Sequence, residues 1–244
     1  MINFFRKKRK KMADDNKALK YTRYAIGEIV LVVIGILIAL QINTWNQNRI
    51  KSNKETTVLA NIHKEFTENK IQLDTVLKWH QVVNSSCAKI INLFPIKSKP
   101  EPAVLDSLSK YLWDSYGGYT FNPSQSSINA LINTSSFDII RNENLRDLLI
   151  SWNDLVEDFQ EEEQYSREYT WNQYDPYMSK HFDFDMNLQD SRNNLEVLQT
   201  LEFEYKVKTR HDLVDQILTS SGELKTLKET LDKIIKLSET QSLD

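Results

Sequence analysis

The chain has 244 residues, one cysteine, five glycines and a formal net charge of −3. The single Cys87 excludes an intramolecular disulfide, and the scarcity of glycine leaves no G-x-G-x-x-G or G-x-x-x-x-G-K loop for binding phosphates. The charge is unevenly distributed, because residues 1–23 carry nine Lys or Arg against two Asp while the rest of the chain is acidic.

The first predicted element is an apolar run, residues 24–45. Up to Ile42 its only strongly polar side chains are Glu28 and Gln41. Eighteen helical residues at about 1.5 Å each extend about 27 Å, close to the hydrocarbon thickness of a bilayer. The run is therefore predicted to be a transmembrane helix.

The flanks of this helix predict its orientation. The positive-inside rule keeps a short Lys- and Arg-rich segment in the cytoplasm, so residues 1–23, with Arg6 to Lys11 as their most basic part, are predicted to be a cytoplasmic tail. Residues 46–244 are then one extracytoplasmic domain of ordinary size. The apolar run is longer than the core of a signal peptide, and no A-x-A-like cleavage site follows it. We interpret it as an uncleaved signal anchor.

Small residues follow one face of the predicted span. Gly27, Leu31, Gly35 and Ala39 succeed one another at intervals of four, and Gly35 with Ala39 forms a small-xxx-small pair. Such a face lets two helices approach closely and favours a homodimer through the span. Gly and Ala are also common in spans that do not associate, so the sequence leaves both interpretations open.

Glu28 is an ionisable group inside the predicted span, which indicates contact with a partner's cationic residue or a proton relay. It also lies about one turn from the cytoplasmic end, close enough to Arg23 and the headgroups to reach polar surroundings. The second interpretation is favoured. Tyr21 and Tyr24 on one side of the span and Trp45 on the other are predicted to be interfacial anchors.

The same stretch resembles a known family. The run Y-A-I-G-E-I-V-L-V-V-I-G-I-L-I-A-L-Q-I-N-T-W-N, preceded by M-I-N-F-F-R-K-K-R-K-K, is similar to the start of a family of uncharacterised single-pass membrane proteins from Bacteroidetes-type bacteria. The later segment I-N-A-L-I-N-T-S-S-F-D-I-I-R-N-E-N-L-R-D-L-L is similar to a second signature of that family. The family often has Gly between the two short helices, where this chain has Thr134, Ser135 and Ser136. The resemblance implies a helical fold and a location in the inner membrane, and it implies no activity.

A long helix is predicted beyond the span. No Gly or Pro interrupts the chain between Gly35 and Pro95, and apolar residues recur at intervals of three and four up to about residue 94. This pattern is typical of an amphipathic helix in a helical bundle or coiled coil, continuous with the span.

The predicted apolar stripe has one cysteine and two interruptions. Cys87 lies on the stripe and is interpreted as a buried small hydrophobe rather than a cross-linking thiol. Asn69 and His80 interrupt the stripe, and His80 is interpreted as a partly buried structural residue.

Shorter elements follow. A loop is predicted over residues 95–102, then a helix over 103–115 that ends at Gly117-Gly118. Ser124 is predicted to cap a brief helix that ends near residue 133.

The C-terminal half predicts further helices. Asn142 is expected to cap a helix that runs to about residue 174. The apolar pattern from about residue 195 onward predicts one or two more helices, with a bend at Gly222.

One stretch resembles a metal-binding loop. Asp183, Asp185 and Asn187 stand at positions 1, 3 and 5 of a calcium loop, but position 6 is Leu188 and position 12 is Asn194, so the Gly and the bidentate Glu are missing. An acidic surface loop is favoured. The four histidines, His63, His80, His181 and His211, show no ligand spacing. We therefore predict no catalytic, cofactor-binding or metal-binding residue and no cofactor.

The predicted fold is all-α: an N-terminal single transmembrane helix followed by an elongated extracytoplasmic helical bundle, in which the long first helix packs with helices near 142–174 and 200–240. The expected function is that of a non-catalytic interaction or accessory protein of the bacterial inner membrane, with a periplasmic C-terminal domain.

Two alternatives remain: a periplasmic ligand-sensing bundle that signals through a partner, because a tail of about twenty residues has no room for an output domain, and an enzyme of unrecognised type. The expected partners are the lipid bilayer, a second copy of the chain through the span, and an unidentified membrane or periplasmic protein. Nucleic acid is not expected, because a basic run beside a span is explained by anionic lipid.

Overall fold

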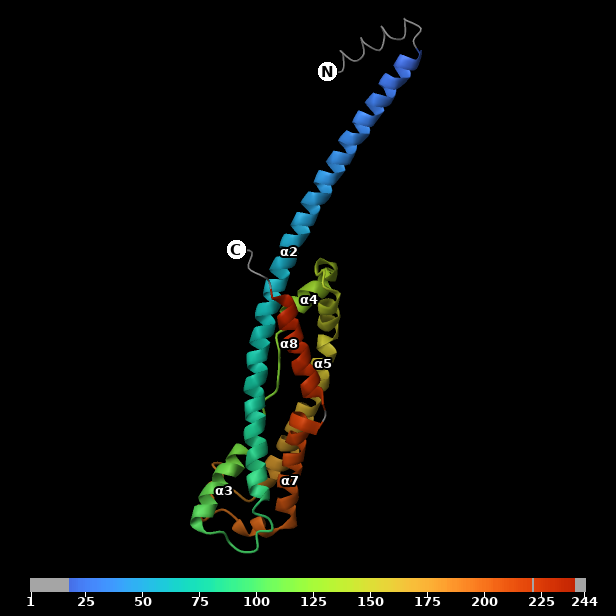
Figure 1. Cartoon of the computed structure of the whole chain (residues 1–244). Helices are drawn as coiled ribbons and strands as arrows, with labels where there is room; N and C mark the ends of the chain where they lie inside the picture. The colour runs from blue at the N-terminus through green and yellow to red at the C-terminus, as the bar shows by residue number, and fades with distance from the viewer. Residues whose placement is uncertain (1–17, 221, 240–244) are drawn as a thin grey trace. The chain divides into compact units, whose positions relative to one another are not determined.

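The computed structural model describes residues 18–220 and 222–239, and every regular element among them is helical. The all-α prediction is therefore confirmed for this part of the chain. Residues up to Glu55 and residues from Thr56 onward form two compact units. One helix, α2 (Ala18–Ile91), begins in the first unit and ends in the second (Figure 1). The predicted basic tail around Arg6 to Lys11 lies outside the described residues.

The second unit contains the remaining elements. Its longer helices are α3 (Pro102–Asp114), α4 (Ser126–Asn133), α5 (Glu143–Tyr169), α7 (Leu201–Asp215) and α8 (Glu223–Ser238). Shorter elements are the 3-10 turns η1 (Phe137–Ile139) and η3 (Leu195–Gln199), the π turns η2 (Thr170–Tyr174) and η4 (Gln216–Ser220), and α6 (Asp175–Met178). The long helix thus ends at Ile91, and the helix predicted to reach residue 174 continues as a π turn after Tyr169.

Local sequence explains where several helices begin. Asn142 Oδ1 accepts a hydrogen bond from the Leu145 N–H at 3.1 Å, so the predicted cap of α5 is confirmed. Gly222 has φ +79°, a left-handed conformation that suits glycine, and it produces the predicted bend before α8. The predicted cap of α4 is wrong: that helix begins at Ser126, because the Ser124 backbone is bound elsewhere.

The apolar stripe predicted on the long helix is confirmed. Buried positions on α2 recur mostly at intervals of three or four from Ile62 to Ile90. Asn69 and His80 lie on the same face and are each 3% exposed. Because buried polar groups require hydrogen-bond partners, these two residues identify places where α2 binds something polar.

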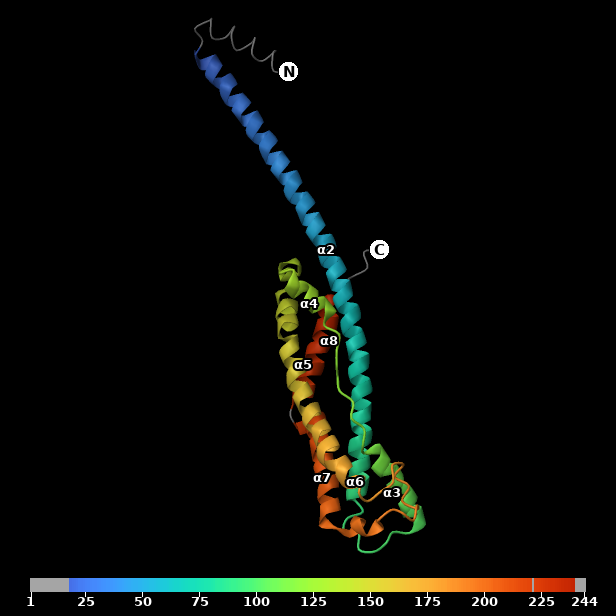
Figure 2. The same ribbon diagram turned by 180° about the vertical axis from the view of Figure 1, so that it is seen from behind.

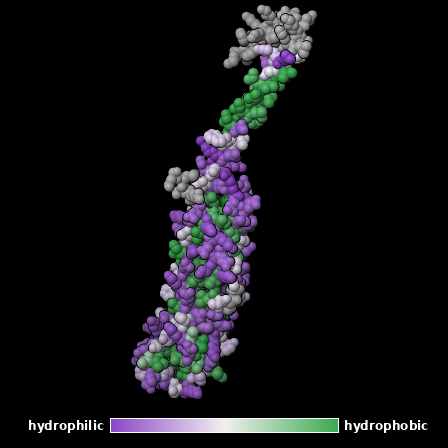
Figure 3. All heavy atoms as spheres, in the orientation of Figure 1, coloured by the Kyte–Doolittle hydropathy of each residue, from purple (hydrophilic) through white to green (hydrophobic). Residues whose placement is uncertain are grey.

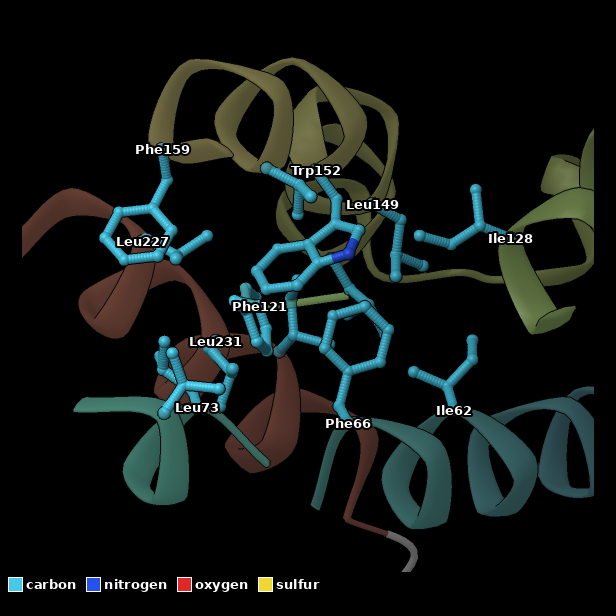
Figure 4. Packing of buried hydrophobic residues seen from close by; sticks show 14 of the residues in the cluster. Ile62, Phe66, Leu73, Phe121, Ile128, Leu149, Trp152, Phe159, Leu227 and Leu231 are labelled. Atoms are coloured by element: carbon cyan, nitrogen blue, oxygen red, sulfur yellow. The ribbon is translucent and has the colours of Figure 1, made fainter. Parts of the chain in front are cut away.

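One buried cluster joins α2 to α4, α5 and α8 (Figure 4). Trp152 of α5 packs edge to face on Phe66 of α2, with ring centroids 4.9 Å apart. Leu227 and Leu231 of α8 and Phe121 from the connection before α4 complete the packing. Each such fully buried side chain stabilises the fold by about 1.5–3 kcal/mol relative to an exposed one.

A second cluster forms around the C-terminal end of α2, together with α3 and α7. Cys87 lies in it and is 0% exposed, so its prediction as a buried small hydrophobe is confirmed. Phe203 of α7 packs edge to face on Phe94, with centroids 5.8 Å apart.

Residues 117–125, which connect α3 to α4, form no regular secondary structure, and we call them the strap. Figure 2 shows this thin connection running beside α2. Ser124 hydrogen-bonds to Asn69, whereas Ser127, at the start of α4, hydrogen-bonds to Glu65 one turn earlier on α2. The strap therefore runs antiparallel to α2, and its backbone groups must be satisfied without a helix or a sheet.

Candidate functional site

The part of α2 between Ile26 and Ile42 presents apolar side chains that are exposed. Ile29, Leu31 and Val32 are 63%, 70% and 62% exposed, and Figure 3 shows a hydrophobic surface along this stretch. The helix is long and apolar enough to cross a membrane. Exposed apolar surface costs about 25 cal/mol per Å² in water, so this stretch is suited to an apolar environment.

The residues predicted to contact another helix in the membrane all lie on α2. Helical geometry places Gly27, Leu31, Gly35 and Ala39 along one side of the helix. A Cβ atom added at Gly27 or Gly35 would meet no described atom within 4 Å. Glu28 is half-buried. Contact of this face with a second helix stays a prediction.

The predicted interfacial anchors are also on α2. Trp45 is 64% exposed, and the guanidinium carbon of Arg49 lies 5.4 Å from the centre of its ring. Tyr24 is half-buried, whereas the side chain of Tyr21 lies outside the described residues. Their role at a membrane interface stays a prediction.

Glu163 of α5 joins three segments of the second unit. Its Oε1 lies 2.9 Å from Nε2 of His80 on α2, and its Oε2 accepts a hydrogen bond of 2.8 Å from the backbone N–H of Phe121 in the strap. Gln160, one turn earlier, donates from Nε2 to the Phe121 carbonyl at 2.6 Å. The side chains of His80 and Glu163 are 3% and 0% exposed. Because both carboxylate oxygens are used and buried, this pair fixes the strap and is inaccessible to a substrate.

From α2, Asn69 binds the next part of the strap and Glu65 binds the start of α4. The Asn69 amide donates to the Ser124 carbonyl and accepts from the Ser124 N–H, both at 2.8 Å. Glu65 Oε2 accepts from Ser126 Oγ at 2.9 Å and from the Ser127 N–H at 2.8 Å. The α4 helix has no side-chain cap of its own, so Glu65 places a carboxylate at its N-terminus, where the helix dipole favours negative charge.

Arg210 of α7 is bound where α3 ends, although it is only 1% exposed. Its Nε donates to the Ser115 carbonyl at 3.1 Å and its Nη2 to the Gly117 carbonyl at 2.5 Å. Its Nη1 donates to Ser166 Oγ at 2.5 Å. A guanidinium at the C-terminal carbonyls of a helix is favourable, and burial lowers the pKa of Arg210.

A cavity of about 440 Å³, partly open to solvent, lies between the end of α3, the π turn η2 and residues 179–186. Most of its wall is aromatic or sulfur-containing: Trp113, Tyr116, Trp171, Phe182, Phe184 and Met186. We call it the aromatic pocket. Asp175 and Asp183 also line it.

The acidic loop beside the pocket is held together by its own hydrogen bonds. Asp183 Oδ1 accepts from the Asn187 N–H and from Asn193 Nδ2, both at 2.9 Å. The described residues contain no group of three or more His, Cys, Asp or Glu arranged to hold a metal ion.

Residues 28–160 match the model of a family of unknown function, DUF6090. The chain belongs to this family. Curated proteins and solved structures gave no match. The matched part of this DUF6090 protein covers more than half of its length and contains the whole strap. The predicted membership of an uncharacterised family is thus confirmed, whereas its membrane location and bacterial source stay predictions.

Sequence reasoning missed the partners that hold the strap in this DUF6090 protein. Asn69 and His80 gave a signal, because each is polar on an apolar stripe. Glu65, Glu163 and Arg210 gave none, since each resembles the many charged residues on solvated helix faces and only the folded chain shows that it is buried.

Proposed function

We propose that this DUF6090 protein is a single-pass protein of the bacterial inner membrane, with a cytoplasmic N-terminus and residues 46–244 in the periplasm. The observation that carries the proposal is the exposed apolar stretch from Ile26 to Ile42 on a continuous helix. The basic residues that precede it support the orientation.

We also propose that the periplasmic part acts by binding rather than by catalysis. In the second unit, His80 and Glu163 are buried and bonded to each other, and Glu163 is also bonded to the strap. Burial raises the pKa of the Cys87 thiol to about 12, which keeps it protonated and poorly nucleophilic at neutral pH. These observations favour an interaction or accessory role.

The orientation is tested with a reporter that is active only in the periplasm. Fused after Asp244, it is expected to be active, and fused before Met1 it is expected to be inactive. Replacing the six basic residues from Arg6 to Lys11 by Gln is the charge control and should reduce the activity of the C-terminal fusion. An inactive C-terminal fusion on the natural chain, made in normal amounts, would contradict the orientation.

We further propose that the face with Gly27, Gly35 and Ala39 forms a homodimer in the membrane. Gly35→Leu should lower the native mass of the complex purified in mild detergent, because the added side chain separates the two helices. Ile36→Leu, one residue along, is the matched control and should leave the mass unchanged. An unchanged mass for Gly35→Leu would refute this dimer.

A substitution of Glu28 tests whether its negative charge also contributes to association through the span. Glu28→Gln should leave membrane insertion intact and change the proteins that copurify from native membranes, because it removes the negative charge that a cationic residue of a partner would contact. Identical copurifying proteins would leave only the interpretation that Glu28 reaches the headgroup region.

One observation favours the alternative of a ligand-sensing bundle. The aromatic pocket lies in the second unit and is lined by rings and carboxylates rather than by a closed apolar core. A ligand bound there would provide the input that a sensor requires.

A further inference from the structure

We propose that the aromatic pocket binds a small organic ammonium ion. Its aromatic rings would surround the cation, and Asp175 and Asp183 would supply the opposing charge. This inference goes beyond the proposed function and holds for either orientation of the chain in a membrane.

The rings of the pocket come from segments far apart in the sequence. Trp113 of α3 and Phe184 of the acidic loop pack edge to face, with centroids 6.1 Å apart. Phe184 is 86% exposed and Trp171, which also lines the pocket, is 60% exposed. Ring faces attract ammonium groups, and each close contact contributes about 0.5–2 kcal/mol. A bound cation would thus make use of aromatic surface that is otherwise open to water.

The charge of the pocket selects for a cation. Asp175 and Asp183 are its charged wall residues, and no Lys, Arg or His is among the described residues that line it. Arg192 interacts electrostatically with Asp183. Its guanidinium, however, is bound to Asp190, with Nη2 2.6 Å from Asp190 Oδ2. An anion would be repelled by this wall, and a neutral apolar ligand would gain nothing from the carboxylates.

The composition of the wall also excludes a bare metal ion as the natural occupant. Calcium and magnesium require about six or more oxygen ligands, and six of the wall side chains are aromatic or sulfur-containing. The volume of about 440 Å³ is within the range of small-molecule pockets.

Tyr116 also lines the pocket, and its hydroxyl oxygen is buried. Burial, then the charge of Asp175 and a hydrogen bond to that carboxylate raise the pKa of this phenol, so Tyr116 adds no negative charge to the wall at neutral pH.

The test uses the full chain in maltoside micelles, which contain no ammonium group. Choline, tetramethylammonium and 3,3-dimethylbutan-1-ol, the neutral isostere of choline, are titrated by calorimetry and by tryptophan fluorescence. We expect saturable binding of both cations and binding of the isostere at least tenfold weaker. Absence of saturable binding of either cation, or equal binding of the neutral isostere, would overturn the proposal.

Variants locate the binding site. Trp171→Ala and Asp175→Asn should each weaken choline binding about tenfold, since each removes one attraction of about 1.4 kcal/mol. Tyr205→Ala and Asp185→Asn are the matched controls, because they remove an exposed ring and a carboxylate that do not line the pocket. Circular dichroism shows whether each variant is folded. Trp171 is largely exposed, so its truncation should preserve the fold even if Asp175→Asn does not. Choline binding by folded Trp171→Ala that equals binding by the natural chain would overturn the placement.

Discussion

Gly117 of the strap packs closely against α2. A Cβ atom at this position would lie 2.8 Å from Val83 Cγ2, closer than real side chains approach, whereas a Cβ at Gly118 would make only an ordinary contact at 3.9 Å. The Gly117 carbonyl also accepts from Arg210. The glycine is therefore required by space and not by its backbone angles.

We expect Gly117→Ala to lower the free energy of unfolding by about 1–3 kcal/mol, because the added methyl group overpacks against Val83. Gly118→Ala, its neighbour, should change stability by less than about 0.5 kcal/mol. Denaturant unfolding followed by circular dichroism measures both. Equal effects of the two substitutions would show that the close contact does not determine stability.

Buried thiol and phenol groups predict loss of stability at alkaline pH. Burial raises the pKa of Cys87 from 9.0 to about 12 and that of Tyr169 from 10.0 to about 12. Above about pH 9 the unfolded chain has lost protons that the folded chain retains, so the free energy of unfolding falls as pH rises until the folded groups ionise near pH 12. The slope is at most about 1.4 kcal/mol per pH unit for each group.

Denaturant unfolding between pH 7 and pH 11 measures this slope. Cys87→Ala should be less stable at every pH, because it leaves a small cavity, but its stability should fall less steeply above pH 9. The same slope in both proteins would contradict the role of Cys87. A direct check is alkylation, which should modify Cys87 only after unfolding.

At the level of single residues, the sequence predicted those roles that depend on contacts with residues nearby in the chain. Asn142 as a cap involves a contact three residues away, and Cys87 follows the helical period. Arg210 depends on carbonyls 93 and 95 residues away, so no local pattern identifies it. Ser135 has φ +49°, in the left-handed region that favours glycine, at the turn where the resemblance implied a glycine.

The strap is the element that determines how α2 and α5 are joined. Its backbone groups are bound by side chains of both helices instead of by a ladder of backbone hydrogen bonds. Buried hydrogen bonds to a charged group contribute about 1.5–3 kcal/mol each, so the bonds from Glu163 to Phe121 and from Arg210 to Gly117 are expected to be its strongest attachments.

We expect Glu163→Gln to lower the free energy of unfolding by about 1–3 kcal/mol, because a neutral amide replaces the carboxylate that is bonded to both His80 and the Phe121 N–H. Glu161→Gln, on an exposed face of the same helix, is the control and should have little effect. Hydrogen exchange adds a local readout, since the Phe121 amide should exchange faster in Glu163→Gln only. Unchanged protection of that amide would contradict the bond to Glu163.

Elements with a strong period were predictable, and connections were not. The long α2, α5 and the bend at Gly222 follow from spacing, caps and glycine. The late start of α4 and the π turn after Tyr169 depend on tertiary contacts: Asn69 binds Ser124, and Tyr174 is fully buried among the rings of the second cluster.

For the whole molecule, the buried clusters predict where the chain can be shortened. The first cluster begins at Ile62, with Val58 and Leu59 partly buried beside it, and the second begins at Val83. A chain that starts at Lys51 should therefore remain soluble without detergent and unfold cooperatively at nearly the melting temperature of the full chain.

A chain that starts at Thr67 is the control. It lacks Ile62, Glu65 and Phe66, and losses of about 2–5 kcal/mol for each large core side chain should leave it unfolded. Circular dichroism melting compares the two. An unfolded Lys51 chain would show that the second unit requires residues 18–50.

The aromatic pocket could not be predicted from the sequence, because it depends on how the whole second unit folds. Its wall combines residues from 113 to 186. The sequence around each ring predicts only an ordinary packed or exposed aromatic side chain. The sequence around Asp183 indicates only an incomplete calcium loop. Its place beside three rings from other segments, Trp113, Tyr116 and Trp171, depends on how α3 and η2 pack, which no short motif records.

The way the strap is held has a consequence for sequence divergence. Helix side chains bind its main chain, and of its own side chains Tyr119, Phe121 and Asn122 contact other elements, whereas most of the others contribute little to the attachment. Substitutions should therefore accumulate at those other positions of the strap among DUF6090 proteins, Gly117 excepted, while Glu65 and Asn69 tolerate almost none. The most variable and the most constrained positions would then be direct neighbours in space, although Asn69 and Ser124 are 55 residues apart in the chain.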